Sequence, residues 1–196
     1  TIWHLVFFFN FFQNNIYQEI GESNEEEKPN VQIIDEGTRN RSYGVMINNL
    51  AVARNLHSGL QDAYLVYEMI VEGGITRFLA LYSNQTTERI GPIRSARPYY
   101  LDYVMENDAY FVHWGYSEQA KEDLQKYGIQ NINGLTHEKY FWRDQTLKVS
   151  LEHRAFTSME KLRQAVDDFA YRKERKESSF FSYTVDELDF QSKEEA

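Results

Sequence analysis

The sequence contains no cysteine, and this absence excludes several kinds of chemistry at once. Disulfide bonds, catalysis by a thiolate and metal sites built on cysteine are all ruled out. Basic side chains are also in the minority, because 21 Lys and Arg stand against 30 Asp and Glu and give a formal net charge of −9. Nucleic-acid binding depends on neutralising phosphates, so this charge argues against a nucleic-acid partner.

Common catalytic and cofactor motifs are absent too. No serine lies in a Gly-x-Ser-x-Gly turn, no His-Glu-x-x-His motif occurs, and no glycine-rich loop has the spacing of a nucleotide-binding site. The five histidines include no pair four residues apart that would hold zinc on a helix. We therefore predict no metal and no cofactor, and we favour a binding protein over an enzyme.

A run of apolar residues lies at the start of the chain, where positions 2–12 are apolar apart from His4 and Asn10. The run is too short to cross a bilayer as a helix, which needs about twenty residues. It resembles the apolar core of a signal peptide or the end of a membrane anchor, and a buried strand is the alternative. The stretch that follows is polar and acidic, as in a flexible spacer. We therefore predict a signal- or anchor-like segment at 1–15 and a polar linker at 16–42.

The remaining patterns predict one α/β domain over residues 43–175. Short apolar runs bounded by turn residues predict strands, and capping residues around amphipathic runs predict helices. The predicted strands cover 43–48, 64–72, 75–82 and 110–113, and the predicted helices cover 98–106, 118–127 and 157–172. This order indicates a mixed α+β fold, with a layered mixed β-sheet flanked by helices in a single main domain. A further apolar run indicates that residues 176–196 begin a truncated second domain or form a tail.

The second and third predicted strands flank a Gly-Gly pair at 73–74, which predicts a β-hairpin. Paired glycines suit the positive φ angles of a two-residue turn. Such a turn pairs Ile70 with Arg77 and places Arg77 on the same face as Glu68 and Glu72, where it forms a cross-strand ion pair. The alternative is a helix over the first run, on which the two glutamates are i, i+4 neighbours.

The most informative stretch is Arg89-Ile-Gly-Pro-Ile-Arg94-Ser-Ala-Arg97-Pro98. It leads three arginines into a proline that suits the first turn of a helix. A guanidinium group presents a planar fork of donors that matches carboxylate or phosphate. Between Arg77 and Arg97 there are four arginines and one acid, Glu88. The sequence therefore predicts a local anion-binding site inside an acidic protein.

A series of motifs, taken in order, resembles the YerB-like family of bacterial exported lipoproteins. The motifs are Val45-Met-Ile-Asn-Asn49, Val66-Tyr-Glu-Met-Ile-Val-Glu-Gly-Gly-Ile-Thr-Arg77, Ile90-Gly-Pro-Ile-Arg-Ser-Ala-Arg-Pro98, His113-Trp-Gly115 and Phe156-Thr-Ser158. The resemblance covers roughly residues 43–171. It implies a protein that is exported and membrane-anchored at the outer face of the cytoplasmic membrane, with an amino-terminal domain of unknown function. Members usually carry a lipobox cysteine, and these 196 residues contain none.

We predict from these features a cell-envelope binding domain. Its ligand is expected to be an anionic small molecule, or the anionic group of a cell-wall polymer, a lipid headgroup or an envelope protein partner. The expected ligand-binding residues are Arg77, Arg94, Ser95, Arg97, Asn48, Glu72 and His113, with Arg89 in the same row. Charge-assisted bidentate contacts would give the specificity.

Two alternatives remain open at this point. The first is an enzyme acting on a phosphate- or sugar-containing envelope substrate, in which arginines stabilise developing charge. The general base would then be Glu68, Glu72 or His113. The second is a protein-interaction domain in which the arginines are purely structural, since buried arginines are costly unless they are paired. Their partners would then be Asp62, Glu68, Glu72 and Asp102.

Overall fold

The computed structural model describes residues 39–176, which fold around a mixed five-stranded sheet of order β2-β3-β1-β4-β5. The strands are β1 (Tyr43–Asn48), β2 (Leu65–Ile70), β3 (Thr76–Tyr82), β4 (Tyr110–His113) and β5 (Asn131–Asn133). Strands β1, β4 and β5 run parallel, whereas β3 is antiparallel to both of its neighbours. This arrangement confirms the predicted mixed α+β class.

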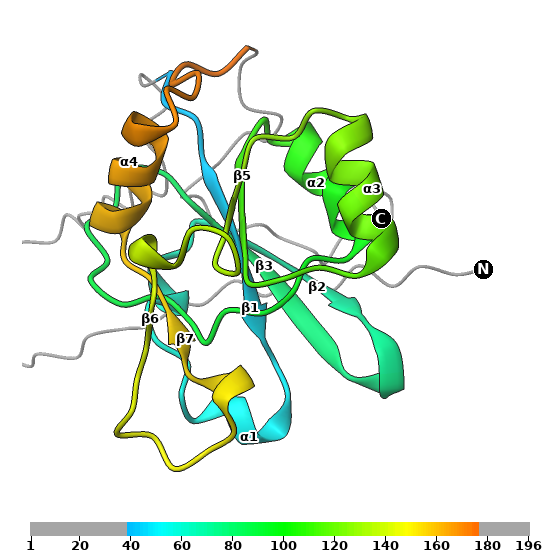
Figure 1. Ribbon diagram of the computed structural model, residues 1–196, viewed down its shortest axis with the longest axis vertical. Coiled ribbons are helices and arrows are strands. Elements are labelled where there is room, and N and C mark those ends of the chain that lie inside the picture. Colours follow the sequence, from blue (N-terminus) through cyan, green and yellow to red (C-terminus); the bar gives the residue numbers. More distant parts are fainter. Residues whose placement is uncertain (1–38, 177–196) are drawn as a thin grey trace, which may run out of the picture.

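Helices cover both faces of the sheet, as Figure 1 shows. Helices α2 (Leu101–Glu106) and α3 (Glu118–Lys126) lie on one side, and α4 (Met159–Asp168) lies on the other. Every residue of β1 is buried, because its alternate side chains enter two separate cores. Val45 packs on the α4 side, and its neighbour Met46 packs on the side of α2 and α3.

Three smaller elements complete the described chain. A short helix, α1 (Ala51–Arg54), follows β1. The two-stranded ribbon of β6 (Trp142–Arg143) and β7 (Ala155–Phe156) lies apart from the main sheet. These elements gather near the end of the sheet at which β1 finishes (Figure 1).

Local signals in the sequence place the helix boundaries well. Pro98 opens the helical turn that leads into α2, and the Ser117 hydroxyl accepts a hydrogen bond from a backbone N–H of α3. Gly128 takes a positive φ just beyond the end of α3. The predicted capping residue of α4 is wrong by one position, because Ser158 is the cap and the Thr157 hydroxyl instead donates to a backbone carbonyl.

Helix α4 is also shorter than predicted. It ends at Asp168, two residues before Ala170, whose φ of 50° is incompatible with a continuing helix. The described chain then runs in an extended form to residue 176. The predicted second domain or tail lies outside the described residues from position 177 on, as does the predicted segment at 1–15.

The β2–β3 hairpin forms, and the alternative helix does not, but the predicted register is wrong by one residue. Arg77 lies opposite Met69, and Ile70 lies opposite Thr76. The connection contains a third residue, Glu72, before the two glycines, and the Val71 N–H donates to the Ile75 carbonyl across it. Because side chains alternate along a strand, a shift of one residue reverses their faces. Arg77 therefore lies on the face opposite Glu68.

The two ends of the described chain lie side by side. Backbone hydrogen bonds join Arg41 to Lys173 and Arg175 to Arg39, in an antiparallel pairing. Arg41 is buried and forms an ion pair with Asp108, which also pairs with an arginine of the closing segment. The chain thus enters and leaves the domain beside the start of β1. None of the described helices is long and apolar enough to cross a membrane.

Candidate functional site

The arginine-rich segment fills a gap between two parallel strands. Strands β1 and β4 pair directly only over their first three residues. Beyond that point residues 92–96 run between them, with the Arg94 N–H donating to the Met46 carbonyl and the Trp114 N–H donating to the Arg94 carbonyl. The side chains of this segment therefore emerge where the carboxyl ends of β1 and β4 diverge. In open sheets with parallel strands, this edge is where ligands commonly bind.

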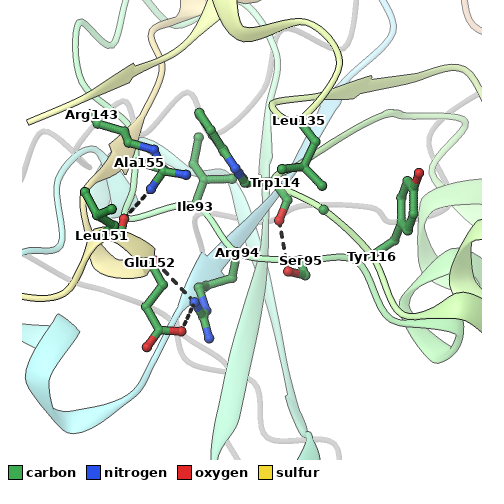
Figure 2. Close-up of a pocket in the computed structure, with 11 residues that line it drawn as sticks. Ile93, Arg94, Ser95, Trp114, Tyr116, Leu135, Arg143, Leu151, Glu152 and Ala155 are labelled. Carbon is green, nitrogen blue, oxygen red and sulfur yellow. Dashed lines mark hydrogen bonds and ion pairs between the residues drawn. The ribbon is translucent and has the colours of Figure 1, made fainter.

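A pocket of about 370 Å³ lies at this position. Figure 2 shows its side chains, which come from the arginine-rich segment, the end of β4, the loop after β5 and the ribbon of β6 and β7. The lining residues are Ile93, Arg94, Ser95, Trp114, Gly115, Tyr116, Leu135, Arg143, Leu151, Glu152 and Ala155. The pocket thus combines apolar walls with two guanidinium groups and one carboxylate.

Arg94 is the central cation of the pocket. Its Nη1 donates to Glu152 Oε2 over 2.7 Å and to the Glu152 main-chain oxygen over 3.3 Å (Figure 2). Its Nε is buried and has no acceptor within residues 39–176. The Arg94 side chain is 19% exposed, whereas that of Glu152 is 55% exposed. The cation is therefore held in place more firmly than its carboxylate partner.

Trp114 forms one wall of the pocket and carries a second buried donor, Nε1, that has no acceptor in the described chain. Its ring lies below the guanidinium of Arg143, whose central carbon is 4.4 Å from the ring centroid. The Trp114 ring also packs against Gly134, where an added Cβ would lie 2.3 Å from the nearest ring atom. The indole is therefore fixed between two neighbours and is not a free stacking platform.

Arg77 does not line the pocket, but it is next to the lining residue Ser95 and is only 4% exposed. Its Nη1 donates to the main-chain oxygen of Ser95 over 2.5 Å, and its buried Nε has no acceptor in the part of the chain described. Burial, with the positive charges of Arg97 and Arg94, lowers the pKa of Arg77 to about 10. Three buried N–H groups without acceptors, on Arg77, Arg94 and Trp114, therefore lie around one short segment.

Hydrogen bonds join the end of β1 to His153, which lies beside the pocket carboxylate. The Leu50 N–H donates to Asn48 Oδ1, which leaves the Asn48 amide nitrogen to donate to His153 Nδ1 over 2.7 Å. The proton of neutral His153 is then on Nε2, which lies 3.6 Å from Glu152 Oε1. Burial lowers the pKa of His153, while the hydrogen bond from Arg94 lowers the pKa of Glu152. Asn48 therefore fixes the orientation of His153 but does not line the pocket.

His113 is fully buried at the end of β4 and does not line the pocket. Its Nδ1 lies 2.7 Å from the Gly115 carbonyl oxygen and its Nε2 lies 3.2 Å from Asn131 Oδ1. Burial lowers its pKa to about 4, so the imidazole is neutral at pH 7. Its hydrogen bond to Gly115 shapes the turn that carries the pocket wall, which is a structural contribution.

The other two arginines of the sequence motif point away from the pocket. Arg97 Nε donates to Glu72 Oε1 over 2.6 Å, and Arg89 Nη2 donates to Asp144 Oδ2 over 2.8 Å. With Arg94 bound to Glu152, three of the four arginines have a carboxylate partner. The sequence argument that nearby acids are too few to neutralise the row is therefore wrong. Two of these acids lie about 50 residues or more along the chain from their arginines.

The acids predicted as general bases or arginine partners do not line the pocket, and one of them, Glu72, pairs with an arginine. Glu68 accepts hydrogen bonds from Asn49 and Thr76, and Asp62 accepts one from Thr87. Glu72 does pair with an arginine, at the hairpin and outside the pocket. Among the residues described, no group of three or more His, Asp or Glu side chains is placed to hold a metal ion.

Sequence reasoning missed Glu152, His153 and Arg143 as site residues. Glu152 supplies the carboxylate of the pocket and Arg143 its second guanidinium. Glu152 and Arg143 belong to no motif, whereas His153, with Phe156-Thr-Ser158, is part of the motif series that resembles the YerB-like family. These residues come together with Arg94 only because the β6–β7 ribbon folds back over residues 92–96. The Ile93 N–H donates to the Ala155 carbonyl oxygen of β7 over 2.8 Å and marks this contact.

These features define a class of protein: an α+β domain with a donor-rich pocket at the carboxyl edge of its parallel strands. The chain belongs to the family described as "Protein of unknown function (DUF3048) N-terminal domain", which matches residues 30–172. This match confirms the resemblance drawn from the sequence motifs.

Two comparisons place the chain within that family. It is 35% identical over 150 residues to the protein named "Putative lipoprotein YerB" of Bacillus subtilis (strain 168), a match that covers 76% of this chain and 44% of the relative. It is also similar to the crystal structure of YerB from Bacillus subtilis, with a TM-score of 0.66 and 34% identity over 80% of this chain and 50% of that one. The chain therefore spans about half the length of the relatives it matches.

Proposed function

We propose that this domain binds an anionic polymer of the bacterial cell envelope in the pocket around Arg94, as part of an exported protein anchored at the outer face of the cytoplasmic membrane. The observation that carries the proposal is the set of buried N–H groups without acceptors on Arg77, Arg94 and Trp114. Buried donors are nearly always satisfied in folded proteins, so the two on lining residues, Arg94 Nε and Trp114 Nε1, call for an acceptor from outside the chain, and Arg77 adds positive charge next to the lining residue Ser95. The anchoring rests on the relative's name as a lipoprotein.

The charge of the site favours an anion over a neutral acceptor. Arg94 and Arg143 line the pocket, and Arg77 is next to the lining residue Ser95, whereas Glu152 is the one acid in the lining. A carboxylate or phosphate oxygen accepts charge-assisted hydrogen bonds from guanidinium groups, and these are about twice as strong as neutral ones. The walls of the pocket are partly apolar, which suits an anionic group borne on a larger body.

The size and form of the pocket suit one unit of a chain. Its volume of about 370 Å³ is at the small end of the range for ligand sites. Leu135 and Leu151, at the rim, are both more than half exposed. An open pocket of this size holds one or two units of a polymer while the rest of the polymer continues into solvent.

The position of the pocket supports a wall polymer over a lipid headgroup. The chain enters and leaves the domain beside the start of β1, where residues 39–41 pair with 173–175. The pocket lies toward the other end of β1, where the Arg94 N–H donates to the Met46 carbonyl, about 10 Å along the strand from its first residue. A tether attached at the first end leaves the pocket facing away from the point of attachment.

The experiment that tests this proposal is a thermal-shift titration of the 196-residue chain and of Arg94→Met. The probes are inorganic phosphate, inorganic pyrophosphate, polygalacturonate and phosphatidylglycerol vesicles. The matched control is Arg89→Met, which also removes an arginine paired to a carboxylate but lies outside the pocket.

We expect polygalacturonate or pyrophosphate to raise the melting temperature of the wild type and of Arg89→Met in a saturable way, and to leave Arg94→Met unshifted. A shift with vesicles alone would contradict the choice of a wall polymer. No shift with any probe, together with a collapsed melting temperature for Arg94→Met, would contradict anion binding and favour the structural alternative.

A further inference from the structure

We infer that Glu152 occupies, in the ligand-free protein, the place that the ligand's anionic group takes against Arg94, so that binding displaces the Glu152 carboxylate. The inference rests on the proposed anion-binding function and describes how the same site is regulated. The affinity of the pocket then depends on how strongly the ligand's anionic group competes with the Glu152 carboxylate for Arg94.

The hydrogen bonds of Arg94 show which partner is able to leave. Two of its contacts go to Glu152, one to the carboxylate and one to the main-chain oxygen. The main-chain contact holds the guanidinium in place whether or not the Glu152 side chain is present. The carboxylate binds one Nη1 atom only, and the buried Nε of Arg94 has no acceptor within the described residues. Glu152 therefore accepts from one nitrogen of the Arg94 guanidinium and leaves the Nε donor without a partner.

The Glu152 side chain meets little resistance to moving. It is 55% exposed, against 19% for Arg94. Exposed ion pairs contribute little to stability, because water solvates the released carboxylate and salt screens the attraction. The remaining contacts of the carboxylate are long: 3.6 Å to His153 Nε2 and 3.4 Å from the Ser150 hydroxyl.

An incoming anion has more donors to engage than Glu152 has. Besides Arg94 Nη1, the pocket offers the Arg143 guanidinium, and the Nε of Arg94 and Nε1 of Trp114 lack acceptors. A phosphate or carboxylate that reaches several of these donors gains more than the single contact it replaces. The displaced Glu152 then remains near the mouth of the pocket and contributes repulsion, which limits the affinity.

The test is calorimetric titration of the 196-residue chain with inorganic pyrophosphate, comparing the wild type with Glu152→Gln and Glu152→Asp. Glu152→Gln removes the competing charge. Glu152→Asp keeps the charge but is one methylene shorter, so it loses the contact with Arg94. The matched control is Glu72→Gln, because Glu72 is a similarly exposed carboxylate paired with an arginine outside the pocket. Arg94→Met reports on the proposed function itself.

We expect both Glu152 variants to bind pyrophosphate about two- to fivefold more tightly than the wild type, as is typical when an exposed ion pair no longer competes. Glu72→Gln should bind as the wild type does. Tighter binding by Glu152→Gln alone would overturn the inference, because it would mean that the charge acts from a distance without occupying the site.

Weaker binding by both Glu152 variants would also overturn it, since Glu152 would then contact the ligand directly. If the wild type binds, Arg94→Met does not, and both Glu152 variants match the wild type, the inference fails while the proposed function stands. If none of the proteins binds pyrophosphate or polygalacturonate, both fail together.

Discussion

Replacing Arg77 by methionine should make the ligand-free protein more stable while it weakens anion binding. Arg77 is buried, and burial lowers its pKa to about 10; pH 7 lies far below that value, so the guanidinium stays charged where charge is unfavourable. This lowering of the pKa corresponds to at most about 3 kcal/mol of lost stability. Against this, Arg77→Met removes the hydrogen bond to the Ser95 oxygen, which contributes roughly 2 kcal/mol when the donor is charged.

The expected balance is a gain of at most about 1 kcal/mol in the free energy of unfolding, because methionine also preserves most of the aliphatic packing. Urea denaturation monitored by tryptophan fluorescence measures this change, and the slope of the transition shows whether the folded state is intact. Polygalacturonate affinity should fall at least tenfold in the same variant. A loss of more than about 1 kcal/mol, with unchanged affinity, would refute the reasoning and make Arg77 a structural residue.

Three further predictions test other parts of the structure. Burial lowers the pKa of His113 to about 4 in the folded protein, below its ordinary 6.5, so its stabilising contribution is complete above pH 6.5 and is lost as the pH falls to about 4. His113→Asn should therefore remove up to roughly 3 kcal/mol of the pH dependence of the unfolding free energy, measured by urea denaturation. An unchanged pH dependence would contradict a neutral, buried His113. Gly134→Ala should displace the Trp114 ring, lower the unfolding free energy by about 1–3 kcal/mol and weaken anion binding. The displaced ring should alter the near-ultraviolet circular dichroism, and an unaltered spectrum would show that the ring is not confined. Ser158→Ala should lower the unfolding free energy by about 1 kcal/mol, because α4 loses its N-terminal cap, and should leave the anion affinity unchanged. A change in affinity would mean that α4 is coupled to the pocket.

The parts of the fold that could be predicted from the sequence are those decided within a few residues. Pro98, Ser117 and Gly128 each act on the backbone next to them, through a fixed φ, a side-chain cap or a permitted positive φ. The hairpin could be recognised for the same reason. Its register could not, because one extra residue in the turn reverses every face, and a Gly-Gly pair suits turns of either length.

The candidate site was predictable only in part, because its members come from distant segments. Arg94 and Ser95 were predicted and line the pocket together. Glu152 and Arg143 lie more than 45 residues further along the chain, and no local spacing signals that they return to Arg94. Arg97 was predicted from the same row as Arg94, but its side chain pairs with a glutamate of the hairpin. Arg94 and Arg97, three residues apart, thus face different environments once the segment is held between two strands.

If the pocket around Arg94 receives an anion, the indole N–H of Trp114 should report its arrival. This N–H is buried at the pocket and lacks an acceptor among the described residues, so a bound anion would give it one. The measurement is a titration of the ¹⁵N-labelled 196-residue chain with polygalacturonate, following the indole resonances of its three tryptophans by NMR. Trp114→Phe assigns the signal.

We expect a saturable downfield shift of the Trp114 indole proton in the wild type, with little change at the other two indoles and no shift in Arg94→Met. A Trp114 resonance that stays in place while other regions of the spectrum respond to the polymer would place the binding site elsewhere and contradict the account.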